Sequence, residues 1–286
     1  MRGTRGYMGG VACVALTATG CASPRWHAPS PELVGDTRRD VYDDSDWAAV
    51  LRENVKDGLV DYDHLAGHRQ ALDRFVAHIS VVGPDSTPSL FTAGPDRVAY
   101  WINAYNALVL YAVLGDYPTD TMYGLDHDHI EHDHRFTVDG RRVVLRDLVD
   151  RMQIESRGDV RIEFALCGAA VGSPPLAPLP YRAETLENQL ARVAHDLVDN
   201  EQLVRVDHAQ RKLLLGQDLI DALDRLVSYY ERRTGAQRAR PLNALMSFTP
   251  SSDKRQVLNR AVGYPVGTIP FDRRLNAWRR DADVPR

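Results

Sequence analysis

Cys167 is the side chain best suited to covalent chemistry, because a cysteine thiolate is a strong nucleophile. It lies in the segment 164–176, which reads FALCGAAVGSPPL. A reactive cysteine needs a nearby histidine or helix N-terminus to lower its pKa. No histidine is close to it in sequence, so His195 or the histidines of 127–134 would have to approach it in space. The alternative, which we favour, is a small buried side chain at the end of a strand.

Four polar side chains are candidates to line a ligand-binding site. Asn103 and Asn106 are three residues apart in an apolar segment, so on a helix they share one face. A buried amide group without a partner costs about 1–3 kcal/mol. The two asparagines therefore either bond to backbone of a neighbouring loop, such as 168–175, or form a polar wall for a ligand. Asp272 and Asn276 allow the same two interpretations. The small residues that begin this loop predict a close backbone approach.

Residues 126–134, DHDHIEHDH, are the candidate metal-binding segment. His-x-His spacing places both imidazole rings on one side of an extended segment. Imidazole and carboxylate together suit zinc, nickel or copper. The alternative is a solvated polar loop whose histidines bind metals weakly and without specificity. The predicted ligands are His127, His129, His132 and His134.

The elements that must position these residues indicate an α+β fold. The segment 95–114 is apolar on nearly all sides, which predicts a buried central helix. Asp139-Gly140 between two short apolar runs predicts a β-hairpin. The alternation of apolar side chains in 161–167 predicts a strand with one buried face. We expect one mostly helical domain over 41–280, packed on a small and mainly antiparallel sheet.

Further elements follow from periodicity and turn residues. A second hairpin is predicted from the apolar runs 203–206 and 212–215. Helices are predicted where apolar residues recur at intervals of three and four. Their ranges are 47–55, 65–82, 147–152, 183–199, 219–230 and 254–262.

The N-terminal residues are typical of a secreted lipoprotein. Residues 1–20 combine a basic start with a short apolar stretch and small residues, which predicts a signal peptide. Small residues directly before Cys21 predict that this thiol receives lipid such as palmitate, and the alternative is ordinary secretion with Cys21 present by chance. The proline-containing segment 22–40 is predicted to be a flexible tether, and 281–286 a tail. Ala22, rather than an acid, after the cysteine favours the outer membrane, facing the periplasm.

The charge balance and cysteine count limit the partners. The chain of 286 residues has 35 basic and 39 acidic residues, a formal net charge of −4, and loss of Arg2 and Arg5 with the signal makes it more acidic. Nucleic acid as a partner is therefore not expected, because phosphate binding needs a basic face. With Cys13 removed and Cys21 lipidated, Cys167 has no cysteine with which to form a disulfide. The expected partners are the membrane and an envelope ligand or protein.

Several motifs in order resemble one family. They are GLVDY at 58–62, YWINAYNAL at 100–108, YP at 117–118, GSPPL at 172–176, FD at 271–272 and LN at 275–276. Their order and spacing resemble the uncharacterised family known as domain of unknown function 547, over about residues 45–280. The resembled family occurs in bacterial envelope proteins and in plants, and the resemblance implies no established reaction.

The chain departs from this family at the positions that would do chemistry. Gly168 and Ser173 stand where members usually have cysteine, and Cys167 stands where they have asparagine. Glu163 and Asp150 replace histidines that the family tends to carry. Members usually have an aromatic residue after the aspartate near the end, whereas here Asp272 is followed by Arg273. The resemblance therefore favours a non-catalytic binding or scaffold domain, lipid-anchored in the cell envelope.

Two alternatives remain open from the sequence. One is a cysteine-dependent hydrolase or transferase that uses Cys167, with a histidine supplied from elsewhere in the fold. The other is an envelope metal-binding protein that acts through the segment 126–134. Whether the protein is an enzyme is thus not decided by the sequence.

Overall fold

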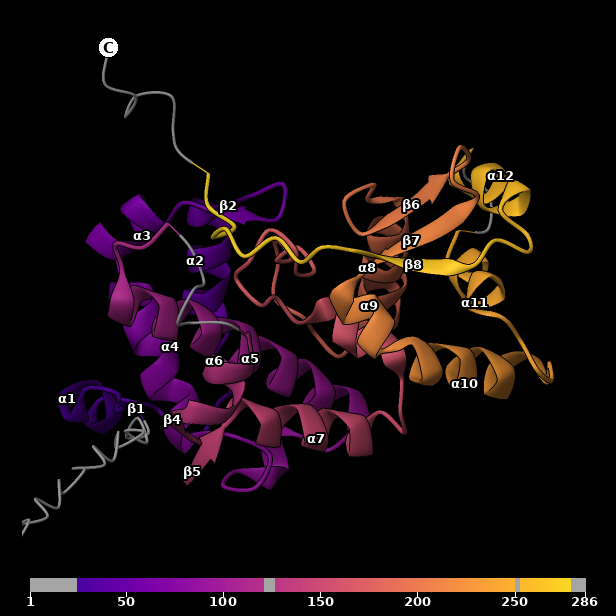
Figure 1. Cartoon of the computed structure of the whole chain (residues 1–286). Coiled ribbons are helices and arrows are strands. Elements are labelled where there is room, and N and C mark those ends of the chain that lie inside the picture. The colour runs from indigo at the N-terminus through magenta and orange to yellow at the C-terminus, as the bar shows by residue number, and fades with distance from the viewer. Residues whose placement is uncertain (1–24, 121–126, 250–252, 279–286) are drawn as a thin grey trace, which may run out of the picture.

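The protein has two lobes, each with its own hydrophobic core, seen on the left and right of Figure 1. The computed structural model describes residues 25–120, 127–249 and 253–278. Helices predominate in these residues, and the strands form small sheets of two or three strands. The predicted α+β class is confirmed. The single domain over 41–280 stays a prediction. The two cores would suit two units, but several segments contribute to both of them.

The first lobe is built around α5 (Gly94–Asp116), the central helix that the sequence predicts. The carboxylate of Asp96 accepts a hydrogen bond from the N–H of Ala93 at 2.8 Å, which stabilises the start of the helix. By length and composition α5 is apolar enough to cross a membrane. However, 89% of its most apolar window is buried by the rest of the protein, so it is a core helix.

Short helices and two hairpins surround α5. The predicted turn at Asp139-Gly140 is confirmed, since both residues have positive φ, +54° and +74°. The helix predicted over 65–82 is divided at His68, whose backbone leaves the helical region. The helical elements are α2 (Ser45–Asn54), α3 (Tyr62–Gly67), α4 (Gln70–Val81), η1 (Pro88–Leu90), α6 (His127–Asp133) and α7 (Leu145–Glu155). The strands are β2 (Val55–Lys56), β3 (Leu59–Val60), β4 (His134–Val138) and β5 (Arg141–Val144).

The prediction of a flexible tether over 22–40 is wrong for much of that segment. It contains β1 (Arg25–His27) and α1 (Pro31–Gly35). β1 pairs in parallel with β4, and Nε2 of His27 lies 2.9 Å from Nδ1 of His134. α1 packs on α4. The β1 contact with β4 joins residues 107 positions apart, and α1 and α4 are also far apart in sequence, so no local pattern in the proline-containing segment indicates these contacts.

The second lobe is built on a three-stranded sheet of order β6-β7-β8. The predicted hairpin is confirmed as β6 (Val204–Asp207) and β7 (Lys212–Gly216), and β8 (Val266–Ile269) adds in parallel to β7. The helix predicted over 219–230 is two helices, α9 and α10. The helices of this lobe are α8 (Leu186–Asp199), α9 (Gln217–Asp221), α10 (Leu223–Thr234), α11 (Pro241–Ser247) and α12 (Asp253–Arg260).

The strand predicted over 161–167 is wrong, and the segment contains the 3₁₀-helix η2 (Val160–Ala165) instead. Side chains three apart share a face of a 3₁₀-helix. Ile162 and Ala165 accordingly enter the first core, while Phe164 enters the second. Because both faces are buried, the apolar alternation that resembles a strand reflects a position between two cores.

A C-terminal strap, residues 270–278, returns the chain from the second lobe to the first. In Figure 1 it is the yellow segment that runs from β8 to β2. Ala277 pairs in parallel with Val60, and Leu275 pairs with Ala170 in antiparallel fashion. The N–H of Trp278 donates to the carbonyl of Val60 at 3.0 Å. The strap therefore joins the last described residues to the first hairpin and to the segment that follows Cys167.

Candidate functional site

The loop 168–175 is fixed by close backbone approaches at both ends. The N–H of Gly172 donates to the carbonyl of Asp272 in the strap at 2.9 Å, and a Cβ on Gly172 would lie 2.7 Å from the Asp272 nitrogen. Gly58 has φ +79°, and a Cβ there would lie 2.3 Å from Cβ of Pro175. The close approach predicted from the small residues is thus confirmed at Gly172. The loop has little room to move or to admit a larger side chain.

Asn103 and Asn106 are buried on α5 and bond to backbone on either side of this loop. Nδ2 of Asn106 donates to the carbonyl of Ala165 at 2.9 Å, and its Oδ1 accepts from the N–H of Cys167 at 2.9 Å. Asn103 makes the same pair of bonds with the backbone of Tyr181, both at 2.8 Å. Each amide therefore uses a donor and its acceptor in fixing backbone. This supports the structural interpretation over a ligand-binding wall.

The thiol of Cys167 is buried, and its surroundings favour the protonated form. The side chain is 1% exposed, and its Sγ accepts a hydrogen bond from Nδ2 of Asn276 at 3.4 Å. Burial raises the pKa of Cys167 to about 11, and hydrogen bonds from Ala169 and Asn276 offset this only in part. Among the described residues, its hydrogen-bond partners include no histidine. Burial and the raised pKa both disfavour the thiolate near neutral pH, which supports the interpretation of Cys167 as a packing group.

Asn276 and Asp272 have different environments. Asn276 is 2% exposed, and besides the thiol its Oδ1 accepts from the hydroxyl of Tyr62 at 2.8 Å. Asp272 is a surface residue whose carboxylate pairs with Arg274, at 2.6 Å for the closest atoms, and this pairing lowers its pKa. The structure therefore brings Asn276 to Cys167 but does not place Asp272 with the two asparagines of α5.

The histidine-rich segment is helical, so the extended geometry predicted for it is wrong. Residues 127–133 form α6, because Ile130 and Glu131 turn inwards and Glu131 accepts a hydrogen bond from the Tyr105 hydroxyl at 2.8 Å. His132 is exposed and His134 is buried beside His27. The side chains of His127 and His129 lie outside the described residues, as does Cys21. Within the described residues no group of three potential ligands is placed to hold a metal ion, and a zinc, nickel or copper site here stays a prediction.

A cleft of about 280 Å³ lies at the junction of the lobes, beside η2. Its side chains carry both signs of charge. Glu163 of η2 makes two contacts of 2.7 Å with Arg225 of α10 and accepts a bond of 3.1 Å from Gln153 of α7. The apolar floor includes Phe164 and Pro174. A small polar or zwitterionic ligand would find paired, pre-oriented charges here.

This cleft adjoins the positions that depart from the resembled family. Glu163 lines it, Pro174, which follows Ser173, lines it too, and Asp150 pairs at 3.1 Å with Arg146, another lining residue. Sequence reasoning noted Glu163 and Asp150 only as replacements and missed Arg225 altogether. No short-range signal could have found that residue, because its contact with Glu163 spans 62 positions.

The central part of the chain matches a known family model. Residues 91–198 match the family described as protein of unknown function, DUF547. This segment belongs to the DUF547 family. It contains α5 with both asparagines, η2, Cys167 and α8. No curated protein and no solved structure matches the chain. The DUF547 match covers the middle of the region 45–280 over which the motifs show a resemblance, and the strap lies outside it.

Proposed function

We propose that this protein is a lipid-anchored, non-catalytic binding or scaffold domain of the bacterial cell envelope. The buried thiol of Cys167 is the observation that carries the non-catalytic part. Its partner is the amide of Asn276 rather than a base, and its pKa is raised to about 11. In the same DUF547 segment, Glu163 and Asp150 are engaged in ion pairs with arginines. These observations support binding over a cysteine-dependent hydrolase.

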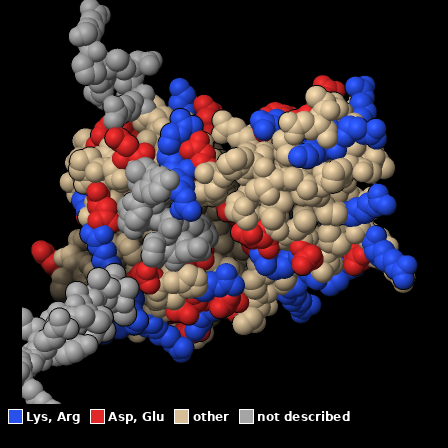
Figure 2. Space-filling model, viewed as in Figure 1, with Lys and Arg blue, Asp and Glu red and all other residues tan. Residues whose placement is uncertain are grey.

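The cleft at the lobe junction is the proposed site for an envelope ligand or protein. Its ion pair between Glu163 and Arg225 has the side chains 18% and 56% exposed, so the pair borders solvent and can exchange partners with a ligand. On the face shown in Figure 2, acidic and basic side chains are interspersed. That pattern and the net charge of −4 support a partner other than nucleic acid.

Lipid on Cys21 is the proposed anchor, in the outer membrane with the domain facing the periplasm. Only three residues separate Cys21 from Arg25, where β1 begins, so the connection has four Cα–Cα steps. At about 3.5 Å per residue, this connection spans at most about 14 Å. The docking of β1 therefore shortens the reach expected from a tether of residues 22–40 and supports a first lobe held close to the membrane.

Alkylation of the native protein tests the role of the thiol. In a chain carrying Cys13→Ala and Cys21→Ala, N-ethylmaleimide at pH 7.5 should label Cys167 at least about a hundredfold more slowly than after unfolding in urea. The matched control adds Cys167→Ala and the exposed Ser228→Cys, and should label rapidly in the native state. Rapid labelling of native Cys167 would contradict a packing role and return the hydrolase to consideration.

Membrane fractionation tests the anchor independently. The unmodified chain should incorporate labelled palmitate and sediment with outer membranes, whereas Cys21→Ser should do neither. Cys13→Ser, which alters a cysteine within the predicted signal, serves as the control and should behave as the unmodified chain. A soluble, unlabelled wild-type protein would refute the anchor without affecting the interpretation of Cys167.

A further inference from the structure

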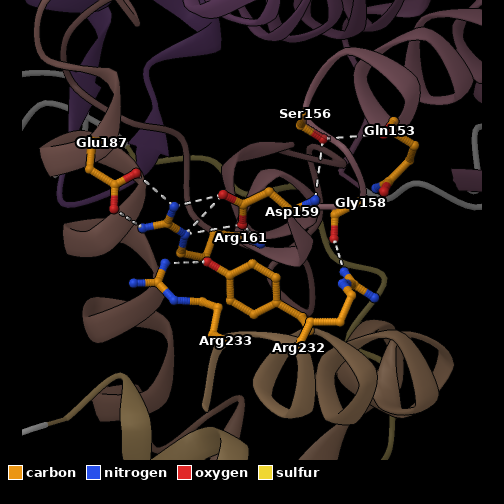
Figure 3. Close-up of polar contacts among 9 residues, drawn as sticks. Gln153, Ser156, Gly158, Asp159, Arg161, Glu187, Arg232 and Arg233 are labelled. Carbon is orange, nitrogen blue, oxygen red and sulfur yellow. Dashed lines mark hydrogen bonds and ion pairs between the residues drawn. The ribbon is translucent and has the colours of Figure 1, made fainter. Parts of the chain in front are cut away.

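Arg161 of η2 lies between two carboxylates that occupy different edges of its guanidinium group, as Figure 3 shows. Asp159 bonds to Nε at 3.0 Å and to Nη2 at 2.6 Å. Glu187, in the first turn of α8, bonds to Nη1 and Nη2, both at 2.8 Å. The Arg161 side chain is only 6% exposed. A buried guanidinium with bidentate carboxylate partners is the geometry by which proteins recognise carboxylates.

The two carboxylates differ in how firmly they belong to the fold. The side chain of Asp159 is 15% exposed, and it also accepts a hydrogen bond of 3.0 Å from the N–H of Arg161, which starts η2. The side chain of Glu187 is 71% exposed and touches Arg161 only with its tip. The Glu187 carboxylate is largely hydrated, so water already competes for it, whereas the buried Arg161 needs an anionic partner at this edge. Another carboxylate can therefore replace Glu187 on Arg161 at low cost, whereas Asp159 is held by the fold.

A pocket of about 660 Å³ opens beside the edge of Arg161 that Glu187 occupies. This volume lies within the range of small-molecule sites. The walls come from α8, from α10 and from the end of α11, and they combine charged with aromatic side chains. They include Tyr229, Tyr230 and Phe248.

A second guanidinium strengthens the positive field of the pocket. Nη1 of Arg233 donates to the hydroxyl of Tyr229 at 2.8 Å. The guanidinium carbons of Arg161 and Arg233 lie 5.8 and 5.6 Å from the centre of the Tyr229 ring. Arg192 and His195 of α8 also line the pocket, and both have acidic neighbours in Asp196. Glu187 is the one acid among the lining residues. An anion with an apolar body fits this combination of two arginines and aromatic walls.

We propose that this pocket binds a small carboxylate attached to an aromatic ring, and that Glu187 is its internal occupant in the unliganded protein. The ligand carboxylate takes the Nη1 and Nη2 positions of Arg161, and Glu187 turns out to solvent. The ring then packs against the aromatic walls. This site is separate from the cleft beside Glu163 and does not depend on the function proposed for that cleft.

Competition between the two carboxylates gives a direct test with benzoate as the probe. Isothermal titration of the full chain should show Glu187→Gln binding benzoate about three- to tenfold more tightly than wild type, because the competing carboxylate is gone. Glu184→Gln is the matched control, since it removes the same charge three residues away and outside the pocket. It should bind benzoate as wild type does. Equal affinity of wild type and Glu187→Gln, or an equal gain in both variants, would overturn the proposal.

A second variant tests the pocket without altering Arg161. Ala191 is an exposed wall residue on α8, and Ala191→Phe should fill the pocket and abolish benzoate binding. Its thermal unfolding midpoint should stay within a few degrees of wild type, which shows that the fold is kept. Retained benzoate binding in this folded variant would refute the site. Acetate, which lacks the ring, should bind at least about tenfold more weakly than benzoate, and equal binding of the two would refute the aromatic part of the proposal.

Discussion

Asn276 donates a hydrogen bond from Nδ2 to Sγ of Cys167 across 109 residues of sequence. The contact joins the C-terminal strap to the segment after η2. The other side of that segment is held by Asn106, whose Oδ1 accepts from the N–H of Cys167 at 2.9 Å. Cys167 is therefore fixed by one amide through its backbone and by another through its sulfur. Both amides restrain the residue, and neither can act as a base towards it.

The buried thiol should make stability fall in alkaline solution. An unfolded cysteine titrates near pH 9, whereas the folded pKa is about 11, so between these values the unfolded chain has lost a proton that the folded chain keeps. The contribution is fully present below pH 9 and is lost as pH rises through 11, by about 1–3 kcal/mol. Urea unfolding at pH 8 and pH 10 should show a smaller loss for Cys167→Ala than for wild type. Parallel losses in the two proteins would contradict the raised pKa.

Removing the amide of Asn106 should destabilise the first lobe. Asn106→Ala leaves the carbonyl of Ala165 and the N–H of Cys167 without their partner, and both are buried. The expected cost is about 2–4 kcal/mol in the free energy of unfolding, measured by urea titration. Asn259→Ala, at an exposed position on α12, is the control and should change it by less than about 0.5 kcal/mol. A loss below 1 kcal/mol at Asn106 would show that water or a rearranged loop replaces the amide.

Gly58 should tolerate no side chain, for a steric reason that can be separated from its backbone angle. Gly58→Ala places a methyl group 2.3 Å from Cβ of Pro175 and should cost more than about 3 kcal/mol. Gly235→Ala is matched in angle, with φ +73° against +79°, but has nothing within 4 Å of the added Cβ. It should cost only about 1 kcal/mol. Equal thermal destabilisation by the two substitutions would argue against contact between the hairpin and the loop.

The docking of β1 should weaken in mild acid through His27. Burial is the largest cause that lowers the pKa of His27 to about 4, followed by the charge of His134. The unfolded chain binds a proton near pH 6.5 while the folded chain does not, so this stability is present above 6.5 and is lost as pH falls towards 4. Since His27 is partly exposed, we expect a loss of about 1 kcal/mol between pH 7.5 and 5.

His27→Phe preserves an aromatic ring that can stack on Phe136, 5.1 Å away in wild type, but cannot take up a proton. Urea unfolding of this variant should therefore depend less on pH over the same range. The exposed His208→Phe should keep the wild-type dependence. The explanation fails if His27→Phe loses as much stability in acid as wild type.

Local patterns predicted the elements whose contacts are also local. The apolar faces of α5 and the turn at Asp139-Gly140 identify their structures because neighbouring residues determine them. The segment around Phe164 was wrongly predicted to be a strand, because burial on both sides of a 3₁₀-helix produces the same alternation of apolar side chains. β1 was missed because its three residues depend on pairing with β4.

The candidate sites divide in the same way. The close approach at Gly172 and the amides that bond to backbone follow from the chemistry of those residues, so both features could be predicted from the sequence. The cleft beside Glu163 could not be predicted, because its lining residues extend from Glu131 to Arg225 and meet only when the two lobes pack. The pair of Arg161 and Glu187 likewise depends on how α8 lies against η2.

The strap has a consequence for the order in which the protein is made. Leu275 belongs to the first core, and Trp278 bonds to the first hairpin, although both are translated after the whole second lobe. A growing chain that has reached only residue 200 lacks these groups and leaves the environment of Cys167 open. The earliest part of the protein thus reaches its final packing only after the last part has been released.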